Sequence, residues 1–293
     1  MTQKRTRRIV LITGCSRGIG LASAIAFAEN GDKVYASVRD IDRASELRDA
    51  AKRHDGNIIP IELDVTKPAT IKAAIDHITS HERVLDIVVN NAGTLQAGAF
   101  ESLTDADIRA VMETNFFGVL NVTRQVLPTM RAQSRGLIMM MSSVSGWAGL
   151  AGDSIYAASK FALEGFTEAI RHEVARWGIK LALIEPAGFR TDLISRGLEA
   201  MPGDVDPYAE FNQRLRQNLA QNAKRGGDPD EVARRLIAIS KSSSEQFRWP
   251  VGGVAEQVQS SLFAGDDTQR DNLLKSAAQI EWWLGSGGAE GSN

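Results

Sequence analysis

Tyr156 and Lys160 are the residues whose types and spacing point most directly to chemistry. They lie four positions apart, so on a helix they share one face and the lysine ammonium can lie near the phenol. A fixed positive charge there lowers the tyrosine pKa from its usual value of about 10, which suits a proton donor or acceptor at neutral pH. Taken alone, the pair is better explained as an ordinary tyrosine and lysine on a surface helix.

The presence of Ser143 favours a catalytic role for this pair. It lies thirteen residues before Tyr156, at the end of a predicted strand, so its hydroxyl is expected to face the same crevice. A hydroxyl there can hold a substrate carbonyl oxygen by a hydrogen bond. Ser142 and Ser145 are close alternatives for this role.

A glycine-rich segment lies where the first predicted strand turns into the first predicted helix: Thr13-Gly14-Cys15-Ser16-Arg17-Gly18-Ile19-Gly20. Glycines let the backbone approach a pyrophosphate, and the helix N-terminus offers unpaired N–H groups to its charge. A tight turn is the alternative, but the position at the carboxyl end of the first strand favours a dinucleotide. The expected cofactor contacts are Gly14, Ser16, Arg17, Gly18, Ile19 and Gly20.

The end of the second predicted strand carries no acid that would take the adenosine ribose hydroxyls. It reads Ala36-Ser37-Val38-Arg39, with no carboxylate before Asp40. Arg39 and Arg17 could form a guanidinium pocket for a 2′-phosphate, although both also suit solvated surface positions. The sequence therefore predicts NADP(H), with NAD(H) as the less favoured cofactor.

Polar residues also end the third and fourth predicted strands, at the same sheet edge. Asp64, followed by Val65, could accept a hydrogen bond from the adenine amino group, but it suits an N-cap before Pro68 nearly as well. The segment Asn90-Asn91-Ala92-Gly93 adds Asn91, Ala92 and Gly93 as cofactor contacts, or forms a turn in which the asparagines bond local backbone.

The elements that must position these residues alternate between short apolar runs and helical patterns. Strands are predicted at 9–13, 34–38, 58–63, 85–89, 137–141, 180–184 and 248–250, and helices at 19–30, 44–53, 68–80, 105–131, 156–177, 208–224, from 228 onward, and at 271–284. This order predicts an α/β fold with a doubly wound (Rossmann) parallel sheet of about seven strands and helices on both faces. Residues 1–284 are expected to form a single domain, with a helical lid insertion at about 191–227 and a disordered tail at 285–293.

Composition excludes several classes of protein. The chain has 293 residues with 34 Lys and Arg against 36 Asp and Glu, a formal charge of −2, so it lacks the basic excess of a nucleic-acid binder. The apolar run at 9–12 is too short for a signal peptide or a membrane span. The single Cys15 excludes an intramolecular disulfide, and no Cys/His cluster has metal-ligand spacing. We expect a cytoplasmic protein without metal, nucleic-acid or membrane partners.

The order of the motifs resembles the short-chain dehydrogenase/reductase family over about residues 7–195. The motifs are, in chain order, TGCSRGIG, NNAG, a serine, YAASK and Glu185-Pro186-Ala187-Gly188. The resemblance implies Tyr156 as proton donor or acceptor and Lys160 as its pKa-lowering partner, which also binds the nicotinamide ribose. Ser143 would orient the carbonyl, and Asn115 would steady a water on the proton path; a buried asparagine satisfied by backbone is the alternative for Asn115.

The same resemblance places Pro186, Gly188 and Thr191 at the nicotinamide, although Pro-Ala-Gly stands here where many members have Pro-Gly. It implies hydride transfer between the nicotinamide and a carbonyl or alcohol carbon. It also implies a homodimer or homotetramer, with the helices at Asp105 and Tyr156 as candidate interfaces.

Two classes of function remain. One is an NADP(H)-dependent carbonyl reductase or alcohol dehydrogenase, and the other is a non-catalytic NADP-sensing regulator. A regulator would be expected to have lost catalytic residues. The enzyme is favoured because the full set is present: Ser143, Tyr156, Lys160 and Asn115. Within the enzyme class, the segment 156–165 resembles hydroxysteroid and retinol-type dehydrogenases. A 3-oxoacyl-acyl-carrier-protein reductase is the rival, disfavoured by the extra residues 254–284. Trp147, Leu150 and Phe189 suggest an apolar pocket, so the expected substrate is a medium-sized hydrophobic ketone or alcohol.

Overall fold

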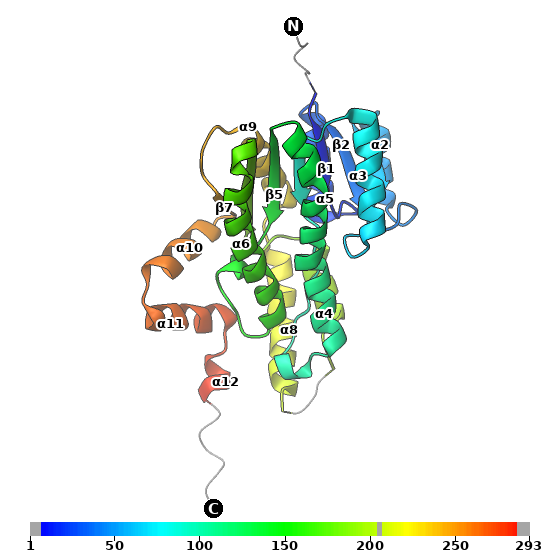
Figure 1. Ribbon diagram of the computed structural model, residues 1–293. Coiled ribbons are helices and arrows are strands. Elements are labelled where there is room, and N and C mark those ends of the chain that lie inside the picture. Colours follow the sequence, from blue (N-terminus) through cyan, green and yellow to red (C-terminus); the bar gives the residue numbers. More distant parts are fainter. Residues whose placement is uncertain (1–6, 204–206, 286–293) are drawn as a thin grey trace, which may run out of the picture.

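The computed structural model describes residues 7–203 and 207–285, and its centre is one sheet of seven parallel strands (Figure 1). The strand order is β3-β2-β1-β4-β5-β6-β7. The strands are β1 (Ile9–Ile12), β2 (Lys33–Val38), β3 (Ile58–Glu62), β4 (Ile87–Asn90), β5 (Gly136–Met141), β6 (Ile179–Pro186) and β7 (Arg248–Val251). The predicted doubly wound sheet is confirmed, including its short seventh strand.

The position of the site follows from the point where the strand order reverses. The chain moves outward from β1 to β3 and then returns to β4 on the other side of β1. All four residues of β1 are buried, as expected for a central strand covered on both faces. The carboxyl ends of β1 and β4 therefore border the crevice in which ligands of open α/β sheets bind.

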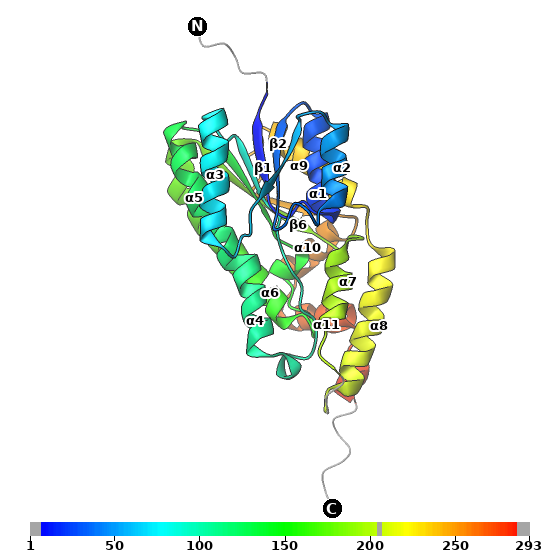
Figure 2. The same ribbon diagram turned by 90° about the vertical axis from the view of Figure 1, so that its right-hand side faces the viewer.

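Two groups of helices cover the two faces of the sheet (Figure 2). One group buries Phe27 and Leu236 among its apolar side chains, and the other buries Ile78 and Val126. The first group is α1 (Gly18–Glu29), α2 (Ser45–Arg53) and α9 (Pro229–Lys241), and the second is α3 (Pro68–Glu82), α5 (Gly118–Ala132) and α6 (Ser154–Val174).

The helix predicted over 105–131 is interrupted. It consists of α4 (Asp105–Met112), a π-helical turn η2 (Glu113–Phe117) and α5. Thr104 and Asp107 form a capping box at its start. Such π turns are frequent at functional sites, and this one carries the buried Asn115.

Further helices lie beyond the carboxyl ends of the strands, in the lower part of Figures 1 and 2. They are α7 (Asp192–Glu199), α8 (Ala209–Arg225), α10 (Ala255–Ala264), α11 (Asp267–Ala278) and α12 (Glu281–Gly285). Elsewhere in the chain, short 3₁₀ turns occur at η1 (Phe100–Ser102), η3 (Val144–Gly146) and η4 (Ala175–Trp177). Sequence patterns predicted neither α7 nor α10. The single helix predicted over 271–284 is wrong, because Gln279 adopts a left-handed conformation with φ 54° and separates α11 from α12.

The C-terminal helices attach to the segment predicted as a lid. The Trp283 ring lies 5.6 Å from the Phe211 ring of α8, and the Arg214 guanidinium lies 3.7 Å above the Trp282 ring. Arg270 of α11 donates a hydrogen bond to the Trp147 carbonyl. The tail predicted at 285–293 lies, apart from Gly285, outside the described residues. Within the described ranges, no helix combines the length and the apolar character that a membrane span requires.

Candidate active site

The glycine loop (residues 13–20) packs closely against the segment that follows β4. Gly14 has φ 75°, and a Cβ added to it would lie 2.9 Å from the Ala92 Cα. A Cβ on Gly20 would lie 2.2 Å from the Gly14 carbonyl oxygen. Only glycine fits both positions, so part of the predicted cofactor motif serves the packing of the loop itself.

Asn91 ties the two segments together. Its Nδ2 donates to the carbonyl oxygens of Thr13, at 2.8 Å, and Gly14, at 3.2 Å. The Thr13 hydroxyl in turn accepts from the backbone N–H groups of Asn91 and Ala92, both at 2.9 Å. The Asn91 side chain therefore bonds the backbone of the glycine loop rather than that of its own turn, and it holds the segment after β4 against the loop.

The start of α1 fits the pyrophosphate of a dinucleotide. Arg17 occupies the N-cap position without a side-chain capping bond, so it leaves the first-turn N–H groups of α1 uncapped. Gly18 follows in a left-handed conformation with φ 59°, and a Cβ added to it would lie 3.5 Å from the Thr191 side chain. Ser16 and Ile19 are partly buried beside it. An anion can therefore approach these donors between the glycine loop and Thr191.

The two predicted phosphate-binding arginines lie in different surroundings. Arg17 Nη1 forms an ion pair with Asp192 Oδ2 of α7 at 2.6 Å, with both side chains about half exposed. Arg39 is exposed after β2 and acts electrostatically on Asp64. Burial acts to raise the pKa of Asp64, but hydrogen bonds from Thr66 and the charges of Lys67 and Arg39 outweigh it, so the pKa is lowered.

Other predicted cofactor residues divide into buried and exposed positions. Val65 is buried and packs against Gly118 of α5 so closely that a Cβ added to Gly118 would lie 2.8 Å from the Val65 Cγ2. Pro186 is buried at the end of β6, whereas Gly188 is exposed and its carbonyl accepts from the Gly227 N–H at 2.9 Å. Gly93 is also exposed.

The structure brings Ser143, Tyr156 and Lys160 together where β5 ends and α6 begins. Ser143 is the N-cap of η3; its hydroxyl accepts from the Ser145 N–H at 3.1 Å and also bonds the Tyr156 phenol. Lys160 Nζ donates to the Met141 carbonyl at 2.8 Å and lies 5.5 Å from the centre of the Tyr156 ring. All three side chains are at least nine-tenths buried.

Asn115 joins this group through the π turn. Its Oδ1 accepts from the Thr94 N–H at 2.8 Å, and its Nδ2 donates to the Thr94 carbonyl at 2.9 Å and to the Ser159 hydroxyl at 3.1 Å. Ser159 in turn donates to the Tyr156 carbonyl at 2.6 Å. Asn115 therefore fixes the segment after β4 to the first turns of α6, through its side chain.

The spacing of Tyr156 and Lys160 predicted a lowered tyrosine pKa. In the structure, the protein's own side chains do not lower the pKa of the Tyr156 phenol. Burial and the charge of Asp153 raise the pKa of Tyr156, and the Ser143 hydrogen bond lowers it by less. Burial lowers the pKa of Lys160 to about 8, against the opposing charge of Glu164. Tyr156 therefore keeps its proton at neutral pH, whereas the pKa of Lys160 lies close to neutral pH.

Sequence reasoning missed Asp153. Its Oδ2 accepts from the Ser145 hydroxyl at 2.9 Å, and its buried Oδ1 has no hydrogen-bond partner within the described residues. Burial raises the pKa of this carboxyl to about 7, with the Ser145 bond acting in the opposite direction. An acid directly before a helix is typical of an N-cap, but Asp153 makes no capping bond. That missing bond is visible only in the structure.

The aromatic residues expected to line a substrate pocket are partly used in packing. Phe189 is buried against Gly227 and Gly252, and Trp147 is buried in a cluster with Leu262 of α10. Leu215 of α8 packs against Gly152, so α8 contacts the loop that precedes α6. The prediction that Trp147 and Phe189 shape an open apolar pocket is therefore not supported by their burial.

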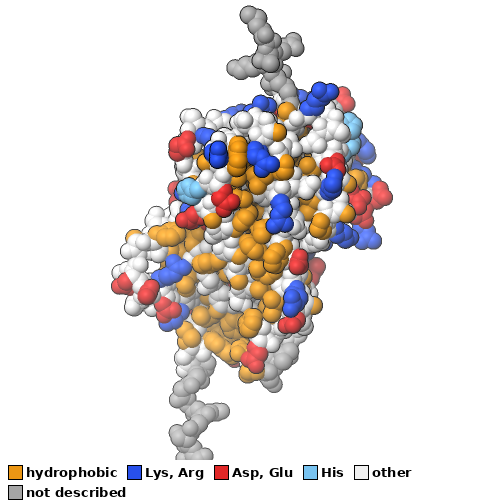
Figure 3. All heavy atoms as spheres, in the orientation of Figure 1, with side chains coloured by type: hydrophobic (Ala, Val, Ile, Leu, Met, Phe, Trp, Pro, Cys, Tyr) orange, Lys and Arg blue, Asp and Glu red, His pale blue; other side chains and the backbone are white. Residues whose placement is uncertain are grey.

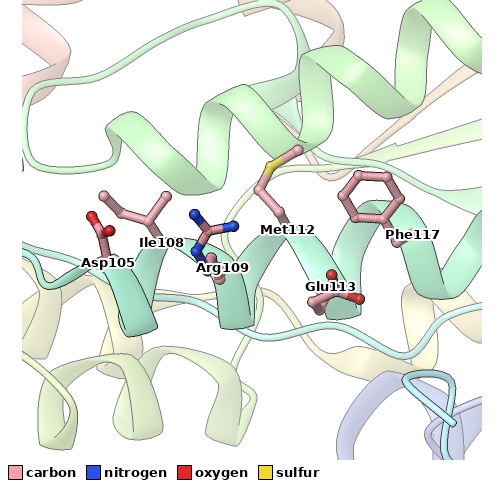
Figure 4. A pocket seen from close by; sticks show the side chains of 6 residues that line it. All are labelled: Asp105, Ile108, Arg109, Met112, Glu113 and Phe117. Atoms are coloured by element: carbon pink, nitrogen blue, oxygen red, sulfur yellow. The ribbon is translucent and has the colours of Figure 1, made fainter.

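A groove of about 260 Å³ lies outside this site, on the outer side of α4 and η2 (Figure 4). None of the predicted site residues lines it. Its lining residues are Asp105, Ile108, Arg109, Met112, Glu113 and Phe117. The described residues contain no group of three or more Asp, Glu, His or Cys side chains placed to hold a metal ion.

Comparison with known proteins gives a consistent family. The model of the short chain dehydrogenases matches residues 8–201. A 3-ketodihydrosphingosine reductase of Bacteroides thetaiotaomicron is 32% identical over 275 residues, covering 93% of this chain and 97% of that protein.

Solved structures agree with this family. A short-chain dehydrogenase from Streptomyces avermitilis matches with a TM-score of 0.79 and 31% identity, covering 97% of this chain and 98% of that one. A gluconate 5-dehydrogenase from Burkholderia cenocepacia, solved in complex with NADP and tartrate, matches with a TM-score of 0.71 and 29% identity, covering 85% of this chain and 95% of that one.

Proposed function

The chain belongs to the short-chain dehydrogenase family of oxidoreductases, which act on alcohol or carbonyl groups, and from this premise we propose an NADP(H)-dependent enzyme. The proposed reaction is hydride transfer between the nicotinamide and a ketone or secondary alcohol of medium size and apolar character. The observation that carries the proposal is the convergence of Ser143, Tyr156 and Lys160 where β5 ends, in the same parallel sheet whose β1 leads into the glycine loop.

Tyr156 is the proposed proton donor in the direction of carbonyl reduction. Ser143 holds the substrate carbonyl oxygen by a hydrogen bond, next to the phenol that it already contacts. The alkoxide that hydride transfer leaves on the substrate is a stronger base than a phenolate, so Tyr156 donates its proton downhill. The Lys160 ammonium then stabilises the phenolate that remains.

The chain's own residues would hold the dinucleotide at the glycine loop. The uncapped start of α1 would bind the pyrophosphate, and Thr191 would close the crevice beside Gly18. Lys160 would also bond the nicotinamide ribose. When bound, NADPH supplies the hydride.

The preference for NADP(H) is supported by the absence of an acid at the end of β2 and by the exposed Arg39 in its place. Arg17 can add a second guanidinium, because its exposed pair with Asp192 is the kind that contributes little to stability and can exchange for a phosphate. The gluconate 5-dehydrogenase relative was solved with NADP. NAD(H) is the weaker candidate.

The apolar substrate is proposed from the apolar side chains that α8 turns toward the loop before α6, the helix that carries Tyr156. Phe211 is buried in α8, and Leu215 packs on the loop before α6. We assign α7 and α8 as the lid and expect its apolar side chains to select the substrate. The Bacteroides relative, named as a reductase of a keto compound, agrees with a ketone substrate.

The direct test is NADPH oxidation, followed by absorbance, on a panel of apolar ketones and aldehydes and of small charged carbonyl compounds. We expect turnover of apolar ketones that the variant Tyr156→Phe loses. Tight NADPH binding without turnover on any compound would instead indicate a cofactor-sensing regulator. Turnover restricted to small charged compounds would reject the apolar substrate class.

A second copy of the chain is the proposed partner of the apolar outer face of α4, η2 and α6. Figure 3 shows hydrophobic side chains gathered on the face viewed there, over these helices. Phe117 and Phe161 are 45% and 42% exposed. Size-exclusion chromatography with light scattering should give a homodimer or homotetramer, and Phe161→Glu should dissociate it, whereas a monomeric wild type would reject this interface.

A further inference from the structure

A group of charged residues, two of them buried, lies on α6, β6 and β7, and its first member follows Lys160 by four positions in the chain. The group comprises Glu164 of α6, Glu185 of β6 and Arg248 of β7, with Glu168 at its edge. We name these four residues the charge network. None of them was a candidate in the sequence analysis.

The network begins one helical turn beyond Lys160. Glu164 follows Lys160 by four positions on α6, so the two side chains share one face of the helix. Both are buried, with 5% of Lys160 and 6% of Glu164 exposed. A buried ammonium loses its hydration, and a nearby carboxylate offsets that loss.

Arg248 forms an ion pair with Glu164 and so favours the ionised form of that carboxyl. Its Nη1 contacts Glu164 Oε2 directly and lies 3.4 Å from Glu185 Oε1, while its Nη2 bonds Glu168 Oε2 at 2.6 Å. Burial raises the pKa of Glu164. The Ser142 hydroxyl, the Arg248 charge and hydrogen bond, and the Lys160 charge oppose that rise without cancelling it. Loss of the guanidinium would raise the pKa of the buried Glu164 carboxyl further and favour its protonated form.

Glu185 competes with Glu164 for the Arg248 guanidinium, because both carboxylates contact its Nη1. It is fully buried and also accepts from Gln259 of α10 at 3.4 Å. Burial and the charge of Glu164 raise the pKa of Glu185 to about 7, against the charge of Arg248. Two buried carboxylates therefore share one guanidinium, and the charge of Glu164 also acts on the Lys160 ammonium.

We propose that Glu164, held ionised by Arg248, is a positioning residue for the reaction: its charge keeps the buried Lys160 ammonium protonated at the pH at which Tyr156 must work. The proposal rests on the proposed function, since it assigns how that site keeps its lysine charged. Within the described residues, the charge of Asp153 acts on Tyr156 and that of Glu164 acts on Lys160, while Arg248 acts on both Glu164 and Glu185 and pairs with Glu168.

Glu168 provides a matched control. It bonds the same arginine from the same helix, but it follows Lys160 by eight positions and its side chain is 58% exposed. Its charge is therefore screened by water and acts weakly on Lys160. Glu164→Gln and Glu168→Gln each remove one carboxylate charge from Arg248 while keeping an acceptor oxygen of nearly the same shape.

The test measures kcat/KM for NADPH-dependent reduction between pH 6 and 10, together with NADPH affinity by fluorescence over the same range. Glu164 raises the pKa of Lys160, so its loss lowers that pKa and the ammonium is lost at lower pH. In Glu164→Gln the basic limbs of both profiles should move down by about one pH unit, roughly a tenfold loss at pH 9. Glu168→Gln should keep the wild-type limbs.

Each outcome has a defined meaning. Limbs of Glu164→Gln that coincide with wild type overturn the role of Glu164 while leaving the proposed function intact. Absence of both NADPH binding and turnover in the wild type rejects the proposed function, and this role with it. If Glu164→Gln fails to fold, Glu164→Asp, which withdraws the carboxylate by one methylene, should give a smaller shift in the same direction, and unmoved limbs there overturn the proposal.

Discussion

The glycine-loop side of the crevice and the Tyr156 side differ in where their charges lie and in how tightly their backbones pack. On the glycine-loop side, Arg17 and Arg39 are exposed, while Gly14 and Gly20 bring backbone into close contact. On the Tyr156 side, the titratable groups themselves lie inside the protein: Lys160 is buried, and so is the Oδ1 atom of the partly buried Asp153.

The difference separates what each side responds to. Exposed charges are screened by salt and contribute modest energies, whereas a buried charge changes its protonation when a neighbour changes. Backbone that is already in contact responds instead to added volume. The glycine-loop side should therefore be sensitive to shape and salt, and the Tyr156 side to single polar atoms and to pH.

The largest effect is expected where one polar atom is removed from the Tyr156 side. Tyr156→Phe removes the proposed proton donor and should reduce kcat by roughly 10²–10⁴-fold, the usual contribution of general acid catalysis, while the fold is retained. Tyr35→Phe is the matched control, because Tyr35 is also buried and its hydroxyl is bonded to Glu82 at 2.8 Å, but on β2. Equal activities of the two variants would contradict the assigned donor.

On the glycine-loop side, added volume should have the corresponding large effect. Gly20→Ala places a methyl 2.2 Å from the Gly14 carbonyl, so the loop must shift; we expect unfolding free energy to fall by about 1–3 kcal/mol and NADPH affinity to fall with it. Gly149→Ala, whose methyl would meet nothing within 4 Å, should change stability by less than about 0.5 kcal/mol. Urea titration and fluorescence binding measure both, and indistinguishable variants would refute the close packing.

The two sides also differ in how far the sequence could predict them. The strands and the glycine motif depend on local patterns, and parallel strands bring their carboxyl ends to one edge of the sheet. For this reason Ser143, Tyr156 and Lys160 could be expected to meet from their positions alone. The same edge places Thr191 beside Gly18.

The buried charges of the Tyr156 side depend on pairings that no local pattern contains. Arg248 reaches Glu164, 84 positions away in the chain, because β7 pairs with β6 in a register that sets Arg248 beside Leu183. A local signal was available for α11, since Asp266 and Gln269 form a capping box that places its start before the predicted residue 271. No comparable signal precedes the break at Gln279.

A smaller effect is expected from an exposed charge on the glycine-loop side. Arg39→Ala should weaken NADPH binding by about tenfold relative to NADH binding, because it removes one charge-assisted contact to the 2′-phosphate at an exposed position. The difference should shrink as salt is raised. Lys52→Ala, which removes an exposed cation of α2 paired with Asp49, is the control and should leave the ratio unchanged. An unchanged ratio in Arg39→Ala would remove the argument for NADP(H).

The smallest effect, and the sharpest contrast between the two sides, concerns pH. The charge of Asp153, present above its pKa of about 7, raises the pKa of Tyr156, so Asp153→Asn should let the phenolate form at lower pH. The rising limb of alcohol oxidation with NADP⁺ should then move down by about half to one pH unit, while rates at pH 6, where Asp153 is protonated in the wild type, stay unchanged. Asp192→Asn, an exposed carboxylate on the glycine-loop side, should leave the limb in place. Because burial raises the folded-state pKa of Asp153 from 3.8 to about 7, the wild type should lose stability as pH rises between these two values and level off above about 7. Urea titrations at pH 5 and 8 should show that loss reduced in Asp153→Asn alone. Equal limbs and equal pH dependence of stability in both variants would mean that the Asp153 carboxyl is hydrated rather than buried, and that the two sides of the crevice do not differ in the way their burial indicates.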